Sequence, residues 1–167
     1  MTALQLRPTI DTAETELAAH AARLATMEPW SRLGYRLEGL LALLSSQQPD
    51  RQSFLMQRGD HPAGVLVLRD PWWRGIYIEL FAVYPEAQQQ GVGRAALDLI
   101  EARRRPGRDN LWLLVSGFNS TAQAFYRRQG FELVGRLPDL VAGGEDELLM
   151  RKRLLPPYNG RISGDTP

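Results

Sequence analysis

Hydrophobic and polar residues follow one another along this chain in the two periods that distinguish strands from helices. Period-two alternation, or a short apolar run rich in branched and aromatic residues, predicts a β-strand, and such segments occur at 4–7, 53–57, 63–69, 76–83, 111–115, 131–137 and 147–154. Apolar residues three and four positions apart predict helices, at about 11–24, 37–44, 91–104 and 119–129. This order of elements predicts an α/β protein in which a mixed sheet carries helices on its faces.

Local signals refine two of these boundaries. Asp11 followed three residues later by Glu14 resembles a capping box, which would open the first helix. The segment 70–75 is expected to be a loop between two strands, and it carries the adjacent Trp72 and Trp73.

Length and composition indicate one compact domain. The chain has 167 residues, of which 44% are hydrophobic and 23% charged, and such a chain suits a single core. We expect this domain to span 1–155 and a tail rich in Pro, Gly and polar residues to follow at 156–167. No apolar run reaches the length of a membrane span, and residues 1–10 lack the basic stretch and apolar block of a signal peptide, so a cytoplasmic location is expected.

The charge balance and the absence of cysteine exclude several classes of function. Twenty Lys and Arg against 19 Asp and Glu give a net charge of +1, which argues against a nucleic-acid or anionic-membrane partner. With no cysteine and two histidines, the chain has no thiolate nucleophile, no acyl-cysteine route and no sulfur-bound zinc. We therefore expect no metal site.

Glycines follow the strand predicted at 76–83. The segment 88–94 reads QQQGVGR and leads into a helix, where backbone N–H groups lack intrahelical acceptors and the helix dipole favours anions. A dinucleotide-binding turn would place its glycines almost directly after the strand and a carboxylate after the next strand; here seven residues intervene, and 111–118 holds no acid. A phosphate-binding P-loop would need a lysine that this segment lacks. An ordinary glycine-rich helix start stays open.

A second motif lies after the strand at 111–115. It reads N-x-x-A-x-x-F-Y-x-x-x-G-F and consists of Asn119, Ala122, Phe125, Tyr126, Gly130 and Phe131. Together with the Q-x-x-G-x-G pattern of Gln88, Gly91 and Gly93, it resembles the GNAT superfamily of N-acetyltransferases, and the likeness extends over 76–153. The resemblance implies a single domain whose mostly antiparallel sheet of about six to seven strands is flanked by about four helices.

The family binds acetyl-CoA, with its pyrophosphate on the glycine turn and its pantetheine arm along a strand that a bulge splays from its neighbour. The stretch that matches this splayed strand is 81–83. The resemblance therefore implies cofactor contacts from Phe81, Ala82, Val83, Gln88, Gln89, Gln90, Gly91, Val92, Gly93, Arg94, Asn119, Ala122 and Phe125. Asn119 has an alternative or additional role as the N-cap of its helix.

Two residues are candidates for the catalytic chemistry. Tyr126 matches the family's usual general acid, because a phenol can protonate or stabilise the departing CoA thiolate; packing beside Phe125 is its alternative. Glu79 is a candidate base for the acceptor amine, since strand alternation places it on the same face as Phe81 and Val83. Weaker candidates for the base are Glu132, Asp139 and the cluster 145–147, which is expected to be a solvated loop.

The expected function is direct transfer of an acetyl group from acetyl-CoA to a primary amine. Its alternatives are an acyl-CoA-binding regulatory module without turnover and a dinucleotide-binding protein. The acceptor stays open among small molecules, peptides and proteins. Specificity is expected from 9–50 and 139–147; Trp30, Tyr35, Trp72 and Trp73 are candidates to line the acceptor pocket or to pack under loops. A homodimer is among the open oligomeric states, because dimers are frequent in similar proteins.

Overall fold

The computed structural model describes residues 2–154 and gives them one sheet with helices on both faces. The strands are β1 (Leu4–Pro8), β2 (Arg51–Arg58), β3 (His61–Trp72), β4 (Gly75–Val83), β5 (Asn110–Ser116), β6 (Glu132–Leu137) and β7 (Glu147–Arg153). The helices are α1 (Glu14–Ala25), α2 (Leu37–Leu44), α3 (Val92–Ala102) and α4 (Ser120–Arg128), with a 3-10 turn, η1, at Pro85–Ala87. The tail expected at 156–167 lies outside the described residues.

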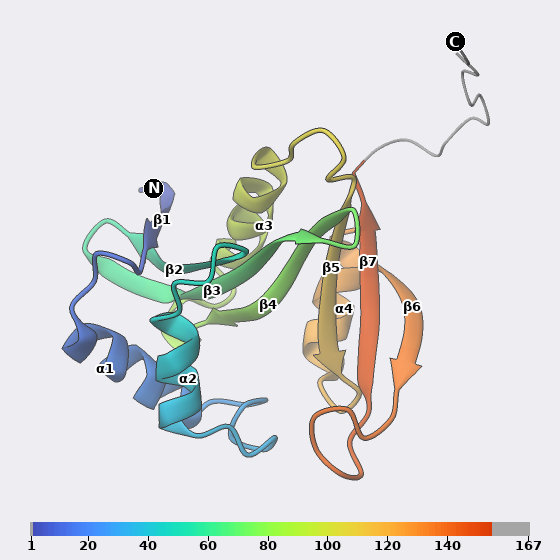
Figure 1. The fold of residues 1–167 in the computed structure, drawn as a ribbon, viewed down its shortest axis with the longest axis horizontal. Coiled ribbons are helices and arrows are strands. Elements are labelled where there is room, and N and C mark those ends of the chain that lie inside the picture. The colour runs from blue at the N-terminus through green and yellow to red at the C-terminus, as the bar shows by residue number, and fades with distance from the viewer. Residues whose placement is uncertain (1, 155–167) are drawn as a thin grey trace.

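The seven strands lie in the order β1-β2-β3-β4-β5-β7-β6 (Figure 1). Neighbouring strands are antiparallel except β4 and β5, which are parallel. The long connection between those two strands contains α3, as a parallel pair requires a crossover. The predicted mixed, mostly antiparallel sheet is therefore confirmed.

Two apolar clusters hold the helices to opposite faces of the sheet. On one face, Leu17 and Leu24 of α1 and Leu40 of α2 pack with residues of β2, β3 and β4. On the other face, Leu97 of α3 and Tyr126 of α4 pack with residues from across the sheet. In Figure 1, α1 and α2 stand in front of the sheet while α3 and α4 lie behind it.

The centre of the sheet is irregular in two ways. The parallel pairing of β4 with β5 runs from Gly75↔Asn110 to Ile78↔Leu113 and stops there, so the two strands diverge beyond it (Figure 1). Between β3 and β4, Leu68 pairs with Ile78 and Val67 with Leu80, which leaves Glu79 as the extra residue of a β-bulge. The expected separation of β4 from its neighbour β5 is thus present. The bulge in β4 is at Glu79, two residues before the stretch 81–83 that the sequence indicates.

The bulge reverses which residues of β4 face which layer. Ile78 belongs to the cluster under α3 and α4, whereas Leu80 belongs to the cluster under α1 and α2. Phe81 packs against the α3–α4 side, while Glu79 bonds Arg51, which also bonds Ser46 beside α2. The prediction that Glu79 shares a face with Phe81 is therefore wrong, because the extra residue interrupts the alternation on which it rested.

Two predicted boundaries also differ from the structure. α1 begins at Glu14 with Ala13 as its N-cap and no side-chain cap, so Asp11 and Glu14 form no capping box. β3 continues to Trp72 and thus occupies much of the predicted loop at 70–75. None of the helices within 2–154 is long and apolar enough to cross a bilayer.

Candidate active site

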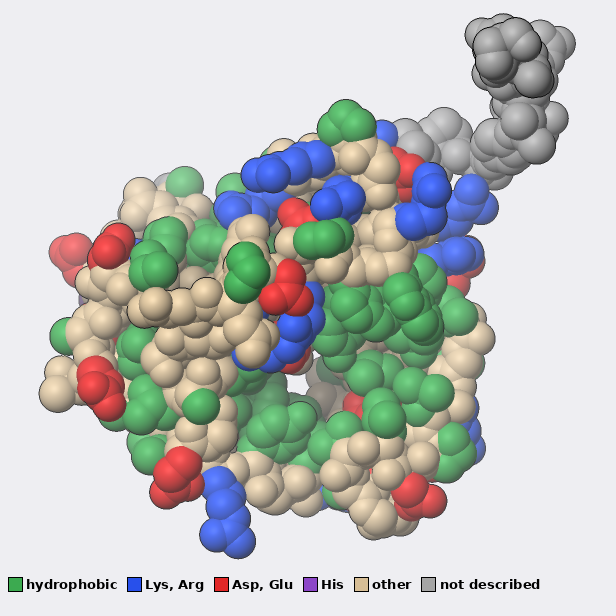
Figure 2. Space-filling view, viewed as in Figure 1, with side chains coloured by type: hydrophobic (Ala, Val, Ile, Leu, Met, Phe, Trp, Pro, Cys, Tyr) green, Lys and Arg blue, Asp and Glu red, His purple; other side chains and the backbone are tan. Residues whose placement is uncertain are grey.

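A cavity of about 250 Å³ opens where β4 and β5 diverge. Its walls come from both strands, from α4, from 29–35 before α2 and from the start of β7. In the space-filling view, hydrophobic side chains border much of the hollow at the centre of the face, and basic and acidic side chains lie along its upper edge (Figure 2). The sheet therefore offers a site at the point where its own hydrogen bonding stops.

The glycine turn places free amide groups at the start of α3. Gly91 is the N-cap and has a φ of +76°, a left-handed conformation that glycine adopts without steric cost. Its carbonyl accepts from the amide of Ala95 at 3.0 Å, so the amides of Val92, Gly93 and Arg94 precede the first intrahelical donor. No atom lies within 4 Å of the position a Cβ would take on Gly91, so this turn is open to an approaching ligand.

Two of the three glutamines in the turn brace its backbone. The side-chain Nε2 of Gln88 donates to the carbonyl of Val83 at 3.0 Å, and that of Gln90 donates to the carbonyl of Glu86 at 2.6 Å. Gln89, between them, has a φ of +58°. The side chains of Gln88 and Gln90 are thus engaged with the loop itself, which leaves its backbone to meet an anion.

Gly93 sets how closely α3 and α4 approach. A Cβ at this position would lie 2.9 Å from Cζ of Phe125, so the ring occupies the space that a side chain would need. Phe125 is half-buried against the main core. The structure thus gives Gly93 and Phe125 a packing role in addition to their predicted place near a cofactor.

Asn119 caps α4 and also lines the cavity. Its side-chain oxygen accepts a hydrogen bond from the amide of Ala122 at 3.1 Å, the contact expected of an N-cap. Asn119 and Ala122 both line the cavity. Phe81 lines it too, whereas Ala82 is buried in the cluster under α1 and α2.

Tyr126 reaches the cavity from the buried face of α4. It is 8% exposed and its ring stands edge-on to Phe125 and Phe131. Burial raises its pKa, which keeps the hydroxyl protonated at neutral pH. Tyr126 therefore places a protonated hydroxyl group on the wall of the cavity.

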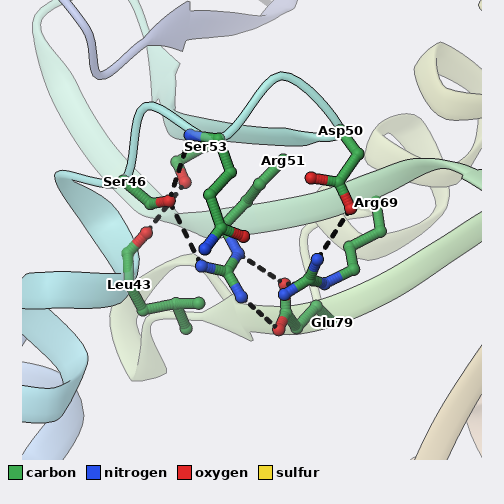
Figure 3. A network of polar contacts seen from close by, with 8 residues as sticks. Leu43, Ser46, Asp50, Arg51, Ser53, Arg69 and Glu79 are labelled. Atoms are coloured by element: carbon green, nitrogen blue, oxygen red, sulfur yellow. Dashed lines mark hydrogen bonds and ion pairs between the residues drawn. The ribbon is translucent and has the colours of Figure 1, made fainter.

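Glu79 lies on the cavity wall but is held by two arginines (Figure 3). Arg51 donates to both carboxylate oxygens, at 2.9 and 3.0 Å, and Nε of Arg69 lies 3.2 Å from Oε2. The side chains of Arg51 and Glu79 are 13% and 21% exposed. Both oxygens are thus committed to guanidinium groups, which makes Glu79 less available to accept a proton from an amine.

Glu147 is the second carboxylate of the cavity. The residue is 4% exposed, lies opposite Ser116 in the β5–β7 pairing and accepts a hydrogen bond from Oγ of Ser116 at 2.8 Å. Burial raises its pKa. The prediction of a solvated loop at 145–147 is therefore wrong for Glu147, because β7 begins at this residue and carries it into the sheet.

Aromatic side chains complete the wall of the cavity. Trp30, Tyr35 and Tyr77 line it, so two of the four aromatic residues predicted for an acceptor pocket lie there. Trp72 and Trp73 instead stack on one another, and Trp72 also stacks on Tyr77, outside the lining. Trp73 is 65% exposed.

Two residues of the cavity wall, and a third that supports the wall from α4, could not be recognised from the sequence patterns. Tyr77 reads as an ordinary strand residue, and Ser116 has no motif around it. Gln123 is buried and donates to the carbonyls of Ser116 and Gly117 at 3.2 and 2.9 Å, which ties α4 to the end of β5. Only its place inside the N-x-x-A-x-x-F-Y motif could have drawn attention to it.

No group of three or more His, Cys, Asp or Glu within the described range is arranged to hold a metal ion. Glu132 is exposed on β6 and Asp139 lies in the β6–β7 loop, where its carboxylate accepts from the amide of Gly144 at 2.6 Å. Neither residue lines the cavity.

Comparison with known proteins gives the following likenesses. The sequence model of the acetyltransferase (GNAT) family matches residues 15–131. An acetyltransferase structure from Thermus thermophilus is 26% identical, with a TM-score of 0.71 over 92% of this chain and 100% of that chain. A nourseothricin acetyltransferase is 34% identical, with a TM-score of 0.58 over 64% and 67% of the two chains.

A more distant structure shares the fold. The ribosomal-protein-S18-alanine N-acetyltransferase from Escherichia coli is 23% identical, with a TM-score of 0.67 over 96% of this chain and 99% of that chain. Among curated proteins, none matches this chain in sequence.

Proposed function

The chain belongs to the GNAT family of acetyltransferases, and we propose that it transfers an acetyl group from acetyl-CoA directly to a primary amine bound between β4 and β5. The observation that carries this proposal is the divergence of the two strands after Ile78 and Leu113. Tyr126 is on the wall of the cavity at this divergence, and β4 is followed along the chain by the glycine turn that starts α3.

The residues present suit acetyl-CoA. The open amides from Gln90 to Arg94 at the start of α3 would meet the pyrophosphate, since a helix N-terminus favours anions. Beyond Ile78, the backbone of β4 is not paired with β5, so its N–H and C=O groups can bind the amides of the pantetheine arm. Asn119 lies at the N-terminus of α4, and Phe125, farther along that helix, packs against Gly93 in the first turn of α3.

The chemistry then follows from the acceptor. An ammonium with a pKa of about 10 has no free lone pair at neutral pH, so a proton must leave before the nitrogen attacks the thioester carbonyl. The C–N bond forms, the C–S bond breaks, and CoA departs as a thiolate. Tyr126 donates the proton that this sulfur takes up. Since the chain has no cysteine, the acetyl group passes straight to the amine.

Two carboxylates line the cavity as candidates to accept the first proton. Glu79, the candidate from the sequence, is held by Arg51 and Arg69, and its geometry supports a role in fixing the bulge of β4. Glu147 has no such basic partner within residues 2–154, where its side-chain contact is the hydroxyl of Ser116. The cytoplasmic location and the homodimer stay predictions.

Calorimetric titration with acetyl-CoA, followed by detection of free CoA thiol in the presence of primary amines, tests the proposal. We expect binding and amine-dependent thiol release. Binding without release for every amine would favour a regulatory module, and NAD binding without CoA binding would favour a dinucleotide-binding protein.

The phosphate cradle is tested separately with Gly91→Val. This variant should weaken binding of CoA but not of pantetheine, which lacks the pyrophosphate. Equal losses for both ligands would show a general distortion of the site, and unchanged affinity for CoA would remove the turn from the binding site.

A further inference from the structure

Glu147 differs from the acidic residues beside it in having no basic partner in the part of the chain that the structure describes. Glu145 pairs with Arg32 at 2.7 Å and Asp146 pairs with Arg136 at 3.1 Å. Glu147 is the buried member of the three, and among the described residues its carboxylate has one side-chain partner, the hydroxyl of Ser116. A buried charge ordinarily has an opposite charge beside it.

The described groups that face Glu147 supply no cation. Tyr35, Tyr77, Tyr126 and Glu79 line the same cavity, and Glu145 lies on the loop before β7. Burial is the main cause that raises the pKa of Tyr35, and the negative charge of Glu147 adds to it. The nearby arginines are already committed, Arg32 to Glu145 and both Arg51 and Arg69 to Glu79.

We propose that Glu147 binds the ammonium group of the acceptor and takes the proton that it must lose. This inference rests on the proposed acetyl transfer and names the group that prepares the amine for it. The acceptor itself supplies the cation that the cavity lacks.

The transfer conserves protons at each step. The acceptor RNH3⁺ gives one proton to the carboxylate of Glu147, which becomes a carboxylic acid. The resulting RNH2 attacks the thioester carbonyl and forms the C–N bond. As the C–S bond breaks, Tyr126 gives a proton to the sulfur and regains one from the nitrogen. Glu147 returns its proton to solvent, and the products are the acetamide and CoA thiol.

The charges of the cavity also select the class of amine. One unpaired carboxylate matches one ammonium group. Apart from Glu79, Ser116 and Asn119, the rest of the wall is aromatic or apolar, with Trp30, Leu33 and Val141 beside three tyrosines. Glu79, the other carboxylate of the wall, is already paired with Arg51 and Arg69, so the described part of the cavity offers no free carboxylate to a second positive charge. The acceptor is therefore a primary amine with a single positive charge on an apolar or aromatic body, either a small arylalkylamine or the N-terminus of a peptide.

Three probe amines distinguish these sources: tyramine, a dipeptide amide with N-terminal phenylalanine, and spermidine. We expect acetylation of tyramine or the dipeptide, with spermidine the poorest substrate, and the better of the first two identifies the source. Preference for spermidine, or acetylation of none of the three by a protein that binds CoA, would overturn the inference. Absence of CoA binding would instead overturn the proposed function.

Glu147→Gln keeps the shape of the side chain and removes its charge. At pH 7 it should lower kcat/KM for the better amine by about 10²- to 10⁴-fold, the usual size of base catalysis, with unchanged affinity for acetyl-CoA. The wild-type rate should reach a plateau above the pKa of Glu147. The rate of the variant should keep rising about tenfold per pH unit towards the pKa of the amine. Glu14→Gln, at the exposed start of α1, is the matched control.

Ser116→Ala provides a second test, in which the pH dependence of the rate is measured. A purely structural role of Glu147 would leave this pH dependence unchanged. The hydrogen bond from Ser116 lowers the pKa of Glu147, so its loss should shift the acid limb of the pH–rate profile upward. A Glu147→Gln variant that keeps the wild-type rate and plateau, or a Ser116→Ala variant whose limb does not move, would remove Glu147 from the mechanism.

Discussion

Arg51 holds Glu79 at two points, with Nε donating to Oε2 at 2.9 Å and Nη2 donating to Oε1 at 3.0 Å. Arg51 starts β2 and Glu79 is the bulged residue of β4, so the pair crosses β3, whose Arg69 joins it from between them. Figure 3 shows this network at the end of α2. The most irregular point of β4 is thus fixed by charge and not by the regular hydrogen bonds of the sheet.

Glu79→Gln tests this assignment. The variant leaves two part-buried guanidinium groups without their carboxylate, and we expect it to lower the free energy of unfolding by about 1 to 3 kcal/mol. Its kcat/KM should fall far less than that of Glu147→Gln, and its pH–rate plateau should persist. Urea unfolding and initial rates provide the measurements. A lost plateau with unchanged stability would restore Glu79 as the base.

Tyr126→Phe should lower kcat by about 10- to 10³-fold, because it removes the proton donor for the CoA thiolate. The affinity for acetyl-CoA, measured by calorimetry, should stay near the wild-type value since the ring remains packed between Phe125 and Phe131. An unchanged kcat, with chemistry shown to limit the rate, would contradict a role in proton transfer.

Asn119 can be tested for its two roles separately. Asn119→Ala should cost about 1 kcal/mol of stability, because the amide of Ala122 loses its cap. Asn119→Ser can still cap α4 and should keep that stability. If the side chain also contacts CoA, the serine variant will bind CoA more weakly at near-normal thermal stability. Equal CoA affinity in the serine variant and the wild type would leave Asn119 as a cap alone.

Gly93 and Phe125 should be strongly coupled. Gly93→Ala places a Cβ 2.9 Å from the Phe125 ring, so α3 and α4 must move apart and the melting temperature should fall. Phe125→Leu relieves this contact, and the double variant should be more stable than the sum of the single effects predicts, by about 0.5 to 3 kcal/mol. Additive losses across the four proteins would disprove close packing at this point.

Glu147→Gln should raise stability at neutral pH while it lowers activity. Burial raises the pKa of Glu147 in the folded chain, so the folded state binds a proton more readily than the unfolded state. The wild type therefore loses stability as the pH rises from the pKa of Glu147 in the unfolded chain through its higher pKa in the folded chain. We expect the melting temperature of the variant to exceed that of the wild type by about 2 to 4 °C at pH 7. The difference should vanish below the ordinary glutamate pKa.

Sequence periodicity predicted the strands and helices well, because the periodicity of a strand or helix depends on residues that are neighbours along the chain. The run at 76–83 is strand and the helix after Gly91 is present. The face of Glu79 could not be predicted, since the bulge depends on how β4 pairs with β3. Glu147 reads as part of an acidic loop beside Glu145, and its burial comes from pairing with Ser116, 31 residues away. Sequence motifs thus predicted the residues of the cofactor side, whereas the candidate acceptor side could be described only from the strand register.

The early end of the β4–β5 pairing gives this sheet inner edges as well as outer ones. A sheet edge normally risks pairing with a strand from another chain. Beyond Ile78 and Leu113, the two inner edges face one another across a cavity of about 250 Å³ inside one molecule. A folded neighbour cannot enter there, whereas a thin, extended molecule can. The gap therefore keeps the unpaired backbone away from the edge strands of folded neighbours.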